Sequence, residues 1–324
     1  MPGSYLSVPY PIRPAKGVER RMFAEAVRRL DQFGPLDGYR YIGFGSPFFA
    51  DFTLFHRSLG IKRMVNIEVR ERDAARFRFN RPFSCVKLAF GDSTTILDRI
   101  GGWNLRTVLW LDYDNRLSAS VLDDVRVVAT NAASGSAFLI TVNAQPVTGR
   151  DPADTDSKRL EEASRLAAVP VASLSVRPEN LGGTGTATYF RSLIQDRLQL
   201  TLNSRNSGLS KDDPKRIEYR QLFHFLYADG PQMLSVGGVL YAQRDESKLD
   251  KTGLGRDSLD FIRTGEEPCD IEVPPLTVHE VHHLNAQLPL RSGRSLAAKG
   301  IPQRHMDRFK SIYRYYPTYV LAEA

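Results

Sequence analysis

Short apolar runs and helical stretches alternate along the first half of the chain. The apolar runs, which predict buried strands, cover residues 39–44, 63–69, 85–90, 107–111 and 137–142. The stretches between them, which predict helices, cover residues 48–59, 72–79, 94–100 and 118–133. Because these runs show no apolar–polar alternation and helices follow them, we expect a parallel sheet that is buried on both faces.

The segments outside this alternation predict how the rest of the chain is organised. The pattern predicts helices over residues 18–33, 157–168, 188–202, 214–227 and 305–315, and strands over 232–242 and 270–273. Residues 146–184 are rich in Pro, Gly, Asp and Thr and are too short for a core of their own. We therefore expect a single α/β domain over residues 1–324. It has an N-terminal extension and helix (1–38), a core (39–145), an insertion or lid with a helix (146–213), and further strands and C-terminal helices (214–324).

The turn after the first strand reads Gly43-x-Gly45-Ser46. Glycine lets the backbone turn tightly and lets a ligand approach without a Cβ in the way. The amides of such a turn and of the following helix can hold polar or anionic ligand groups. A Gly-x-Gly turn alone is weak evidence, because many such turns are purely structural.

Three carboxylates follow the next three strands at similar intervals. Glu68 ends the second strand, 25 residues after Gly43, and Asp92 and Asp112 follow the third and fourth strands. These strand ends share one edge of a parallel sheet, so the four positions are expected to meet there. A carboxylate at Glu68 can accept two hydrogen bonds from a ribose, and Asp92 can accept from an adenine amino group. Each acid can instead be a solvated group or a helix cap, and Asp92 is well placed to cap the helix at Thr94.

This order of glycines and acids resembles the class I S-adenosylmethionine (SAM)-dependent methyltransferases over about residues 39–145. Three short strings also resemble a bacterial group described as O-methyltransferases: Arg13-Pro14-Ala15-Lys16, residues 79–85, and Leu111-Asp112-Tyr113-Asp114. The resemblance implies a Rossmann-like, mostly parallel seven-stranded sheet flanked by helices. It also implies a SAM cofactor and methyl transfer to an acceptor over the strand ends.

The resemblance implies a role for each matching position. Gly43, Gly45 and Ser46 would line the methionine and ribose part of SAM, Glu68 would hold the ribose, Asp92 and Ser93 the adenine, and Asp112 and Tyr113 would face the methyl. Asp112 or Asp114 would take the proton of an acceptor hydroxyl. Arg13 and Lys16 would neutralise a substrate anion, the alternative being plain solvation.

The sequence also departs from the family pattern. Ser46-Pro47-Phe48 replaces the third glycine, and Tyr39-Arg40-Tyr41 stands where an acid is usual. The turn Asp-Tyr-Asp-Asn at residues 112–115 is not the Asp/Asn-Pro-Pro-Tyr of amino-methylating enzymes, which favours an oxygen acceptor. The sequence does not identify that acceptor.

Composition and charge narrow the class of protein. The chain is 42% hydrophobic and 25% charged, as in ordinary soluble globular proteins. It has no apolar run long enough to span a membrane and no segment of signal-peptide type, so we expect a cytoplasmic bacterial protein that does not enter a membrane. The net charge of +7, with arginines at 70, 72, 76, 78 and 81, permits a nucleic acid as partner without requiring one.

Three alternative functions stay open at this point. Residues 279–283 match the His-Glu-x-x-His pattern of zinc hydrolases, although Thr277 and Glu280 also fit a helix capping box, and we expect no metal site. A Gly-x-Gly turn followed by an acid also occurs in nicotinamide-dependent oxidoreductases. The third alternative is a degenerate methyltransferase fold that binds nucleic acid or another protein.

Overall fold

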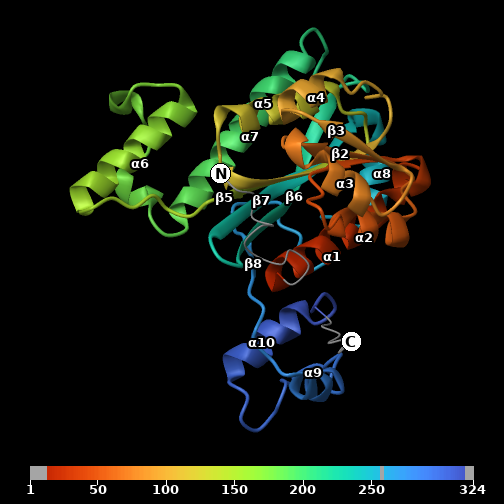
Figure 1. Ribbon diagram of the computed structural model, residues 1–324, viewed down its shortest axis with the longest axis vertical. Coiled ribbons are helices and arrows are strands. Elements are labelled where there is room, and N and C mark those ends of the chain that lie inside the picture. The colour runs from red at the N-terminus through yellow and green to blue at the C-terminus, as the bar shows by residue number, and fades with distance from the viewer. Residues whose placement is uncertain (1–12, 256–258, 318–324) are drawn as a thin grey trace.

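The fold is built on one large mixed sheet. The computed structural model describes residues 13–255 and 259–317 (Figure 1). Its strands are β1 Arg40–Gly43, β2 Arg63–Glu68, β3 Val86–Phe90, β4 Thr107–Arg116, β5 Ser136–Asn143, β6 Ile217–Ala228, β7 Gln232–Ala242 and β8 Cys269–Ile271. Their order is β3-β2-β1-β4-β5-β7-β6-β8, with β7 antiparallel to both of its neighbours and every other described pair parallel. The Rossmann-like class is confirmed, but the sheet has eight strands rather than the expected seven, because β6 forms where a helix was expected.

Helices cover both faces of this sheet. They are α1 Pro14–Arg28, α2 Ala50–Leu59, α3 Ala74–Asn80, α4 Ser93–Arg99, α5 Ala119–Asn131, α6 Pro152–Ala167, α7 Gly185–Arg205, α8 Glu246–Lys251, α9 Val278–Asn285 and α10 Gln303–Ile312. One apolar core lies between the sheet and α1 and α2, and a second lies between the sheet and α4, α5 and α7. This double layer explains why the strands read as apolar runs without alternation.

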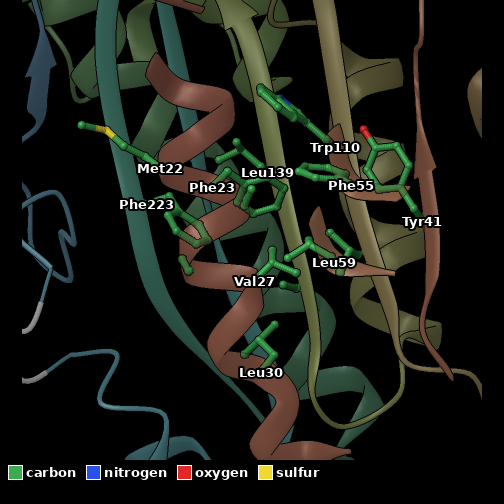
Figure 2. Close-up of a cluster of buried hydrophobic side chains, with 14 of the residues drawn as sticks. Met22, Phe23, Val27, Leu30, Tyr41, Phe55, Leu59, Trp110, Leu139 and Phe223 are labelled. Carbon is green, nitrogen blue, oxygen red and sulfur yellow. The ribbon is translucent and has the colours of Figure 1, made fainter. Parts of the chain in front are cut away.

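Helix α1 packs its buried face into the first core (Figure 2). The Phe23 ring lies edge-on to the rings of Phe55, Trp110 and Phe223, at centroid distances of 5.8, 5.5 and 5.1 Å. Phe55 lies on α2, Trp110 on β4 and Phe223 on β6. One aromatic side chain therefore fixes α1 against elements from both halves of the sequence, and edge-to-face pairs of this kind add about 0.5–1.5 kcal/mol each to the burial of their area.

The prediction of a helix over residues 214–227 is wrong. This segment is β6, which lies between β7 and β8, and residues 221–227 are all buried. The segment contains two residues each of Arg, Tyr, Leu and Phe, one Ile and no Val. A short apolar run does not distinguish a strand from a buried helix by period alone. Pairing with β7 over its whole length determines the outcome.

Two peripheral segments lie apart from the sheet. Helix α6, predicted over residues 157–168, begins earlier and extends away from the body (Figure 1). The Arg116 guanidinium at the end of β4 holds it through two hydrogen bonds to the Glu162 carboxylate, of 2.6 and 2.5 Å. At the other end, α9 and α10 enclose a small apolar cluster of their own, which includes Leu284 and Phe309. None of the helices in the described ranges is both long and apolar enough to cross a membrane.

Candidate functional site at the carboxyl edge of the sheet

The register of the sheet aligns the predicted positions at one edge. Gly43 at the end of β1 pairs with Asn66 on β2 and with Trp110 on β4. Glu68 and Asp112 each lie two residues beyond those partners, on either side of β1. With a rise of about 3.3 Å per residue and a strand spacing of about 4.8 Å, both backbones extend ~7 Å past Gly43 and lie ~10 Å apart.

Asp92, the third of the predicted acids, lies at the same edge of the sheet. Glu68 pairs with Phe90 at the end of β3, and Asp92 follows Phe90 by two residues. The positions therefore follow the ends of β3, β2, β1 and β4, which are neighbours in that order. The strand order reverses between β1 and β4, and the crevice outside such a reversal is where doubly wound sheets bind ligands.

The two glycines of the first turn are required by packing inside the protein. A Cβ on Gly43 would lie 2.5 Å from the Tyr41 hydroxyl oxygen, and one on Gly45 would lie 2.7 Å from Asn66 Oδ1. The Gly45 amide also donates to Asn66 Oδ1 at 2.5 Å. The glycines alone are therefore explained without a ligand.

The remainder of this turn is strained. Ser46 and Phe49 have φ values of 44° and 47°, in the left-handed region that residues with a Cβ seldom adopt. Such positions cost about 1–3 kcal/mol each and are concentrated at ligand sites. The strained turn lies directly above the end of β1.

Glu68 has a carboxylate oxygen that can accept a hydrogen bond from a ligand. Its Oε1 accepts from the Arg70 amide at 2.8 Å, while Oε2 receives no hydrogen bond from any described residue. Burial raises the pKa of Glu68, and the neighbouring charges of Asp73 and Asp114 act in the same direction. The next side chain, Val69, is aliphatic and yet 70% exposed. An oxygen acceptor thus lies beside an uncovered apolar surface.

Asp92 caps a helix, as its alternative interpretation predicted. Its Oδ1 accepts from the amides of Thr94 and Thr95 at 3.0 and 3.3 Å, at the start of α4. The residue is exposed, so the cap does not bury the carboxylate. The neighbouring Ser93 hydroxyl turns inward and donates to Asp124 Oδ2 at 2.5 Å.

Asp124 on α5 connects three elements of the site and was missed in the sequence. Its fully buried carboxylate accepts hydrogen bonds from the hydroxyls of Ser93, Thr94 and Tyr113. Burial raises the pKa of Asp124, and burial together with the Asp124 charge raises the pKa of Tyr113. The Tyr113 hydroxyl is therefore committed to α5, whereas the Asp112 carboxylate is engaged by α1. The sequence signal that could have identified Asp124 is its position, as an acid, on the apolar face of the helix predicted at 118–133.

Lys16 reaches the same edge from the start of α1. Its Nζ lies 2.7 Å from Asp112 Oδ1 and 2.9 Å from Glu19 Oε2, and donates to the Tyr227 hydroxyl at 3.0 Å. It also lies 4.4 Å from the centre of the Trp110 ring. With 3% of its side chain exposed, Lys16 is not the solvated residue of the alternative interpretation. Its charge is engaged by carboxylates of the protein itself.

The other substrate and base candidates lie nearby. Arg13 is the half-buried residue that precedes α1 at its N-terminus, and Asp114 is exposed near the end of β4. Asp112, Tyr113 and Asp114 lie within β4, which continues to Arg116, rather than after the strand as expected. The extension brings these side chains further out along the edge.

The N-terminus of α1 is fixed by a residue far away in the sequence. The carboxylate of Asp229, just after β6, accepts from the amides of Ala15 and Lys16 at 3.1 and 2.9 Å. Two amides at a helix start are thereby satisfied by an anion, which also suits the helix dipole. No local pattern predicts this contact, because more than 200 residues separate the partners.

A cavity of about 560 Å³ opens beside this contact. Its wall includes the start of α1, the ends of β6 and β8, and Arg308 of α10; among its residues are Pro14, Ala15, Thr184, Tyr227, Asp229, Gln232, Asp270, Glu272 and Arg308. Arg308 pairs with Glu272 across the wall. Through Tyr227, the cavity is one hydrogen bond from Lys16 and two from Asp112. Its volume is in the range of small-molecule sites.

The His-Glu-x-x-His segment forms α9 and has a structural role. The Thr277 hydroxyl accepts from the Glu280 amide at 3.2 Å, and the Glu280 carboxylate accepts from the Thr277 amide at 2.7 Å, which completes the predicted capping box. Within residues 13–255 and 259–317, no three His, Cys, Asp or Glu side chains are grouped to hold a metal ion.

Several solved structures resemble this fold. Trm1 from Pyrococcus horikoshii in complex with SAM shares 10% identity at a TM-score of 0.43, over 78% of this chain and 64% of that one. The O-methyltransferase TomG from Streptomyces achromogenes, with SAM, shares 10% identity at 0.37, over 67% and 79%. The O-methyltransferase from Bacillus cereus, with SAH, shares 12% identity at 0.37, over 67% and 80%. Comparison with curated proteins gives no match.

The family comparison covers almost the whole sequence. The family described as "Putative O-methyltransferase" matches residues 8–324. The match includes every element that forms the carboxyl edge, from α1 to β4, and the cavity beside it. The chain therefore belongs to this family of O-methyltransferases.

Proposed function

We propose that the protein is a cytoplasmic, single-domain bacterial enzyme that transfers a methyl group from SAM to an oxygen of its acceptor. The proposal depends on one observation, the alignment of Gly43, Glu68, Asp92 and Asp112 at the ends of four adjacent strands. Family membership supports the reaction class. The exposed Val69 beside Glu68 supports an adenosine at this edge, because an apolar face next to a carboxylate oxygen suits a flat base joined to a ribose.

The charge of the edge favours a cationic cofactor. The strand ends present four carboxylates, those of Glu68, Asp92, Asp112 and Asp114, and Lys16 pairs with Asp112. An edge rich in carboxylates attracts a sulfonium and repels an anion. SAM carries that positive charge on the sulfur that bears its methyl group.

The start of helix α2 disfavours a nicotinamide dinucleotide. Its pyrophosphate would bind at the N-terminus of the helix after β1. Here the first turn of that helix, α2, contains Asp51, which is 6% exposed and accepts a hydrogen bond from Tyr41. A pyrophosphate would approach this carboxyl group, and the left-handed Ser46 and Phe49 take the place of further glycines.

The residues of this chain divide the work of the reaction. When bound, SAM supplies the electrophilic methyl group. Glu68 Oε2 would accept from the ribose hydroxyls, and Asp92 would face the adenine with the oxygen that does not cap α4. The Asp112 carboxylate is already engaged by Lys16 Nζ at 2.7 Å. We therefore assign removal of the acceptor proton to Asp114, with the acceptor hydroxyl at the carboxyl edge and the remainder of the acceptor extending into the cavity beside Tyr227.

Calorimetry with SAM tests the cofactor site. Wild-type protein should bind SAM, and Glu68→Ala should weaken binding by at least about tenfold, or ~1.4 kcal/mol, because the ribose loses its acceptor. Glu71→Ala is the matched control, since Glu71 is an exposed acid only three residues away.

The controls separate the proposal from its alternatives. Glu71→Ala should bind SAM like the wild type. Equal affinity of Glu68→Ala and wild type would remove the ribose assignment. Binding of a nicotinamide dinucleotide in place of SAM would favour the oxidoreductase, and binding of neither would favour a degenerate fold that only binds macromolecules.

A further inference from the structure

Helix α3 presents arginines and a phenylalanine to solvent at one end of the sheet. Residues 70–81 contain five arginines and two acids, Glu71 and Asp73. Arg72, Arg76, Arg78 and Arg81 are exposed, and Phe79 is 89% exposed, the highest value among the exposed large hydrophobic residues that the structure describes. We call these five residues the arginine face.

The geometry of α3 explains why this face points outward. Ala74 and Phe77 are the buried residues of the helix, and the Phe77 ring lies edge-on to Phe49 and Phe90. At about 100° per residue, Phe79 lies about 160° around the helix from Phe77, and Arg76 and Arg78 lie about 100° to either side of Phe77. The buried side anchors the helix, so the exposure of Phe79 is a fixed property of the fold rather than a frayed end.

The neighbourhood extends the positive charge. Helix α3 packs against β3, which is the edge strand of the sheet, and Lys87 on that strand is exposed. The Arg78 guanidinium lies 5.7 Å from the centre of the Phe90 ring, so it is held over the end of β3. The arginine face thus combines four exposed arginines with one exposed aromatic ring.

We propose that the arginine face binds a single-stranded nucleic acid, with arginines on the phosphates and Phe79 stacked on a base. Charge complementarity alone would admit any polyanion. The exposed ring selects among them, because bases stack on aromatic side chains and an acidic peptide or a polysaccharide has no equivalent group. The face follows directly from Glu68, since Arg70 donates its amide to that carboxylate.

Fluorescence anisotropy with a labelled 20-nucleotide single-stranded RNA tests the proposal without SAM. The quadruple variant Arg72→Gln, Arg76→Gln, Arg78→Gln, Arg81→Gln should bind at least about tenfold more weakly. Its slope of log affinity against log salt should fall by roughly 3, at ~0.7 for each lost phosphate contact. Phe79→Ala alone should weaken binding at least about fivefold with no change in that slope.

A second basic segment provides the matched control. Arg291, Arg294, Lys299 and Arg304 are also exposed and lie in the C-terminal segment. Their fourfold change to Gln removes the same charge and should leave RNA affinity within about twofold. Equal losses in both quadruple variants would overturn the proposal, as would a wild type that does not bind the RNA. Heparin binding of equal strength with no effect of Phe79→Ala would also overturn it. All variants concern exposed side chains, and thermal melting confirms their folding.

Discussion

Lys16 is a lysine that the fold has removed almost completely from water. Its ammonium group faces Asp112 and Glu19 and lies over Trp110, so two carboxyl groups and an aromatic face replace its hydration. Glu19 is fully buried, and this burial raises its pKa, which the positive charge of Lys16 opposes. The cluster depends on its single cation to hold two acids at one end of the core.

Replacing that cation should destabilise the protein strongly. Lys16→Met removes the positive charge that pairs with Asp112 and Glu19, and removal of one partner from a buried pair typically costs about 3–5 kcal/mol. The free energy of unfolding in urea measures the loss. Lys248→Met is the control, because Lys248 is 42% exposed in its pair with Asp245 and should cost at most about 1 kcal/mol. Similar losses for the two variants would contradict this account of the cluster.

His224 on β6 should make stability depend on pH. Burial, helped by Arg191, lowers the pKa of His224 to about 4, and the residue is 2% exposed. The unfolded chain binds this proton below pH ~6.5 and the native protein does not, so native stability falls as the pH drops from ~6.5 to about 4. The full effect is roughly 3 kcal/mol.

The measurement compares variants at two pH values. Unfolding free energies at pH 7 and pH 4.5 should differ less for His224→Gln than for the wild type, because Gln does not titrate. His282→Gln changes an exposed histidine and should keep the wild-type difference. An unchanged pH dependence in His224→Gln would show that other groups account for the acid sensitivity.

For single residues of the site, the sequence predicted their places along the strands better than it predicted their contacts. Glu68 and Asp92 were predicted at the strand ends where they lie, because strand ends are read from apolar runs. The partners of Lys16 and the inward turn of Ser93 were not predicted, because Asp229, Tyr227 and Asp124 reach them from distant segments. Long-range partners of this kind leave no periodic signal in a single sequence.

Helix α6 is attached to the rest of the molecule through few contacts. Its residues are mostly exposed or half-buried, with only Ala163 and Leu166 buried. The two hydrogen bonds between Arg116 and Glu162 join it to the end of β4. An element with so little buried apolar area opens more easily than the core.

Removing that attachment should loosen the helix alone. Glu162→Gln removes the charge of a paired carboxylate, worth about 1.5 kcal/mol or more, so amide exchange in α6 should become roughly tenfold faster. Glu161→Gln, on an exposed neighbour, should leave exchange unchanged. Hydrogen exchange followed by mass spectrometry resolves the helix. Equal protection in Glu162→Gln would mean that α6 is held by its other contacts.

For the strands, the hydrophobic periodicity and the residue types determined which could be predicted from the sequence. The strands from β1 to β5 and β7 were found within a few residues, with the exception of β4, which is longer than its apolar run. The polar end of β4, residues 112–116, continues pairing with β5 beyond a register shift, and nothing in Asp-Tyr-Asp-Asn predicts a strand. Strand β6 was missed because its pairing partners, rather than its residue types, decide its conformation.

The whole molecule consists of a double-sided core and a small C-terminal unit. The sheet separates two apolar clusters, one on each of its faces. Helices α9 and α10 enclose a third cluster. In Figure 1 this C-terminal unit lies apart from the sheet, yet Arg308 and residues 272–275 line the cavity. The unit therefore contributes to the wall in which we place the acceptor.

The contact between Asp229 and the start of α1 has a consequence for synthesis of the chain. A ribosome releases residues 13–145, with the whole predicted cofactor edge, long before it reaches Asp229. Until Tyr227 and Asp229 emerge, the first helix lacks the cap from Asp229, and Lys16 lacks its contacts with Tyr227. The N-terminal half of the chain therefore cannot complete its packing during the early part of synthesis. Nascent chains that end before residue 229 would contain the carboxyl edge without the contact between Asp229 and the start of α1.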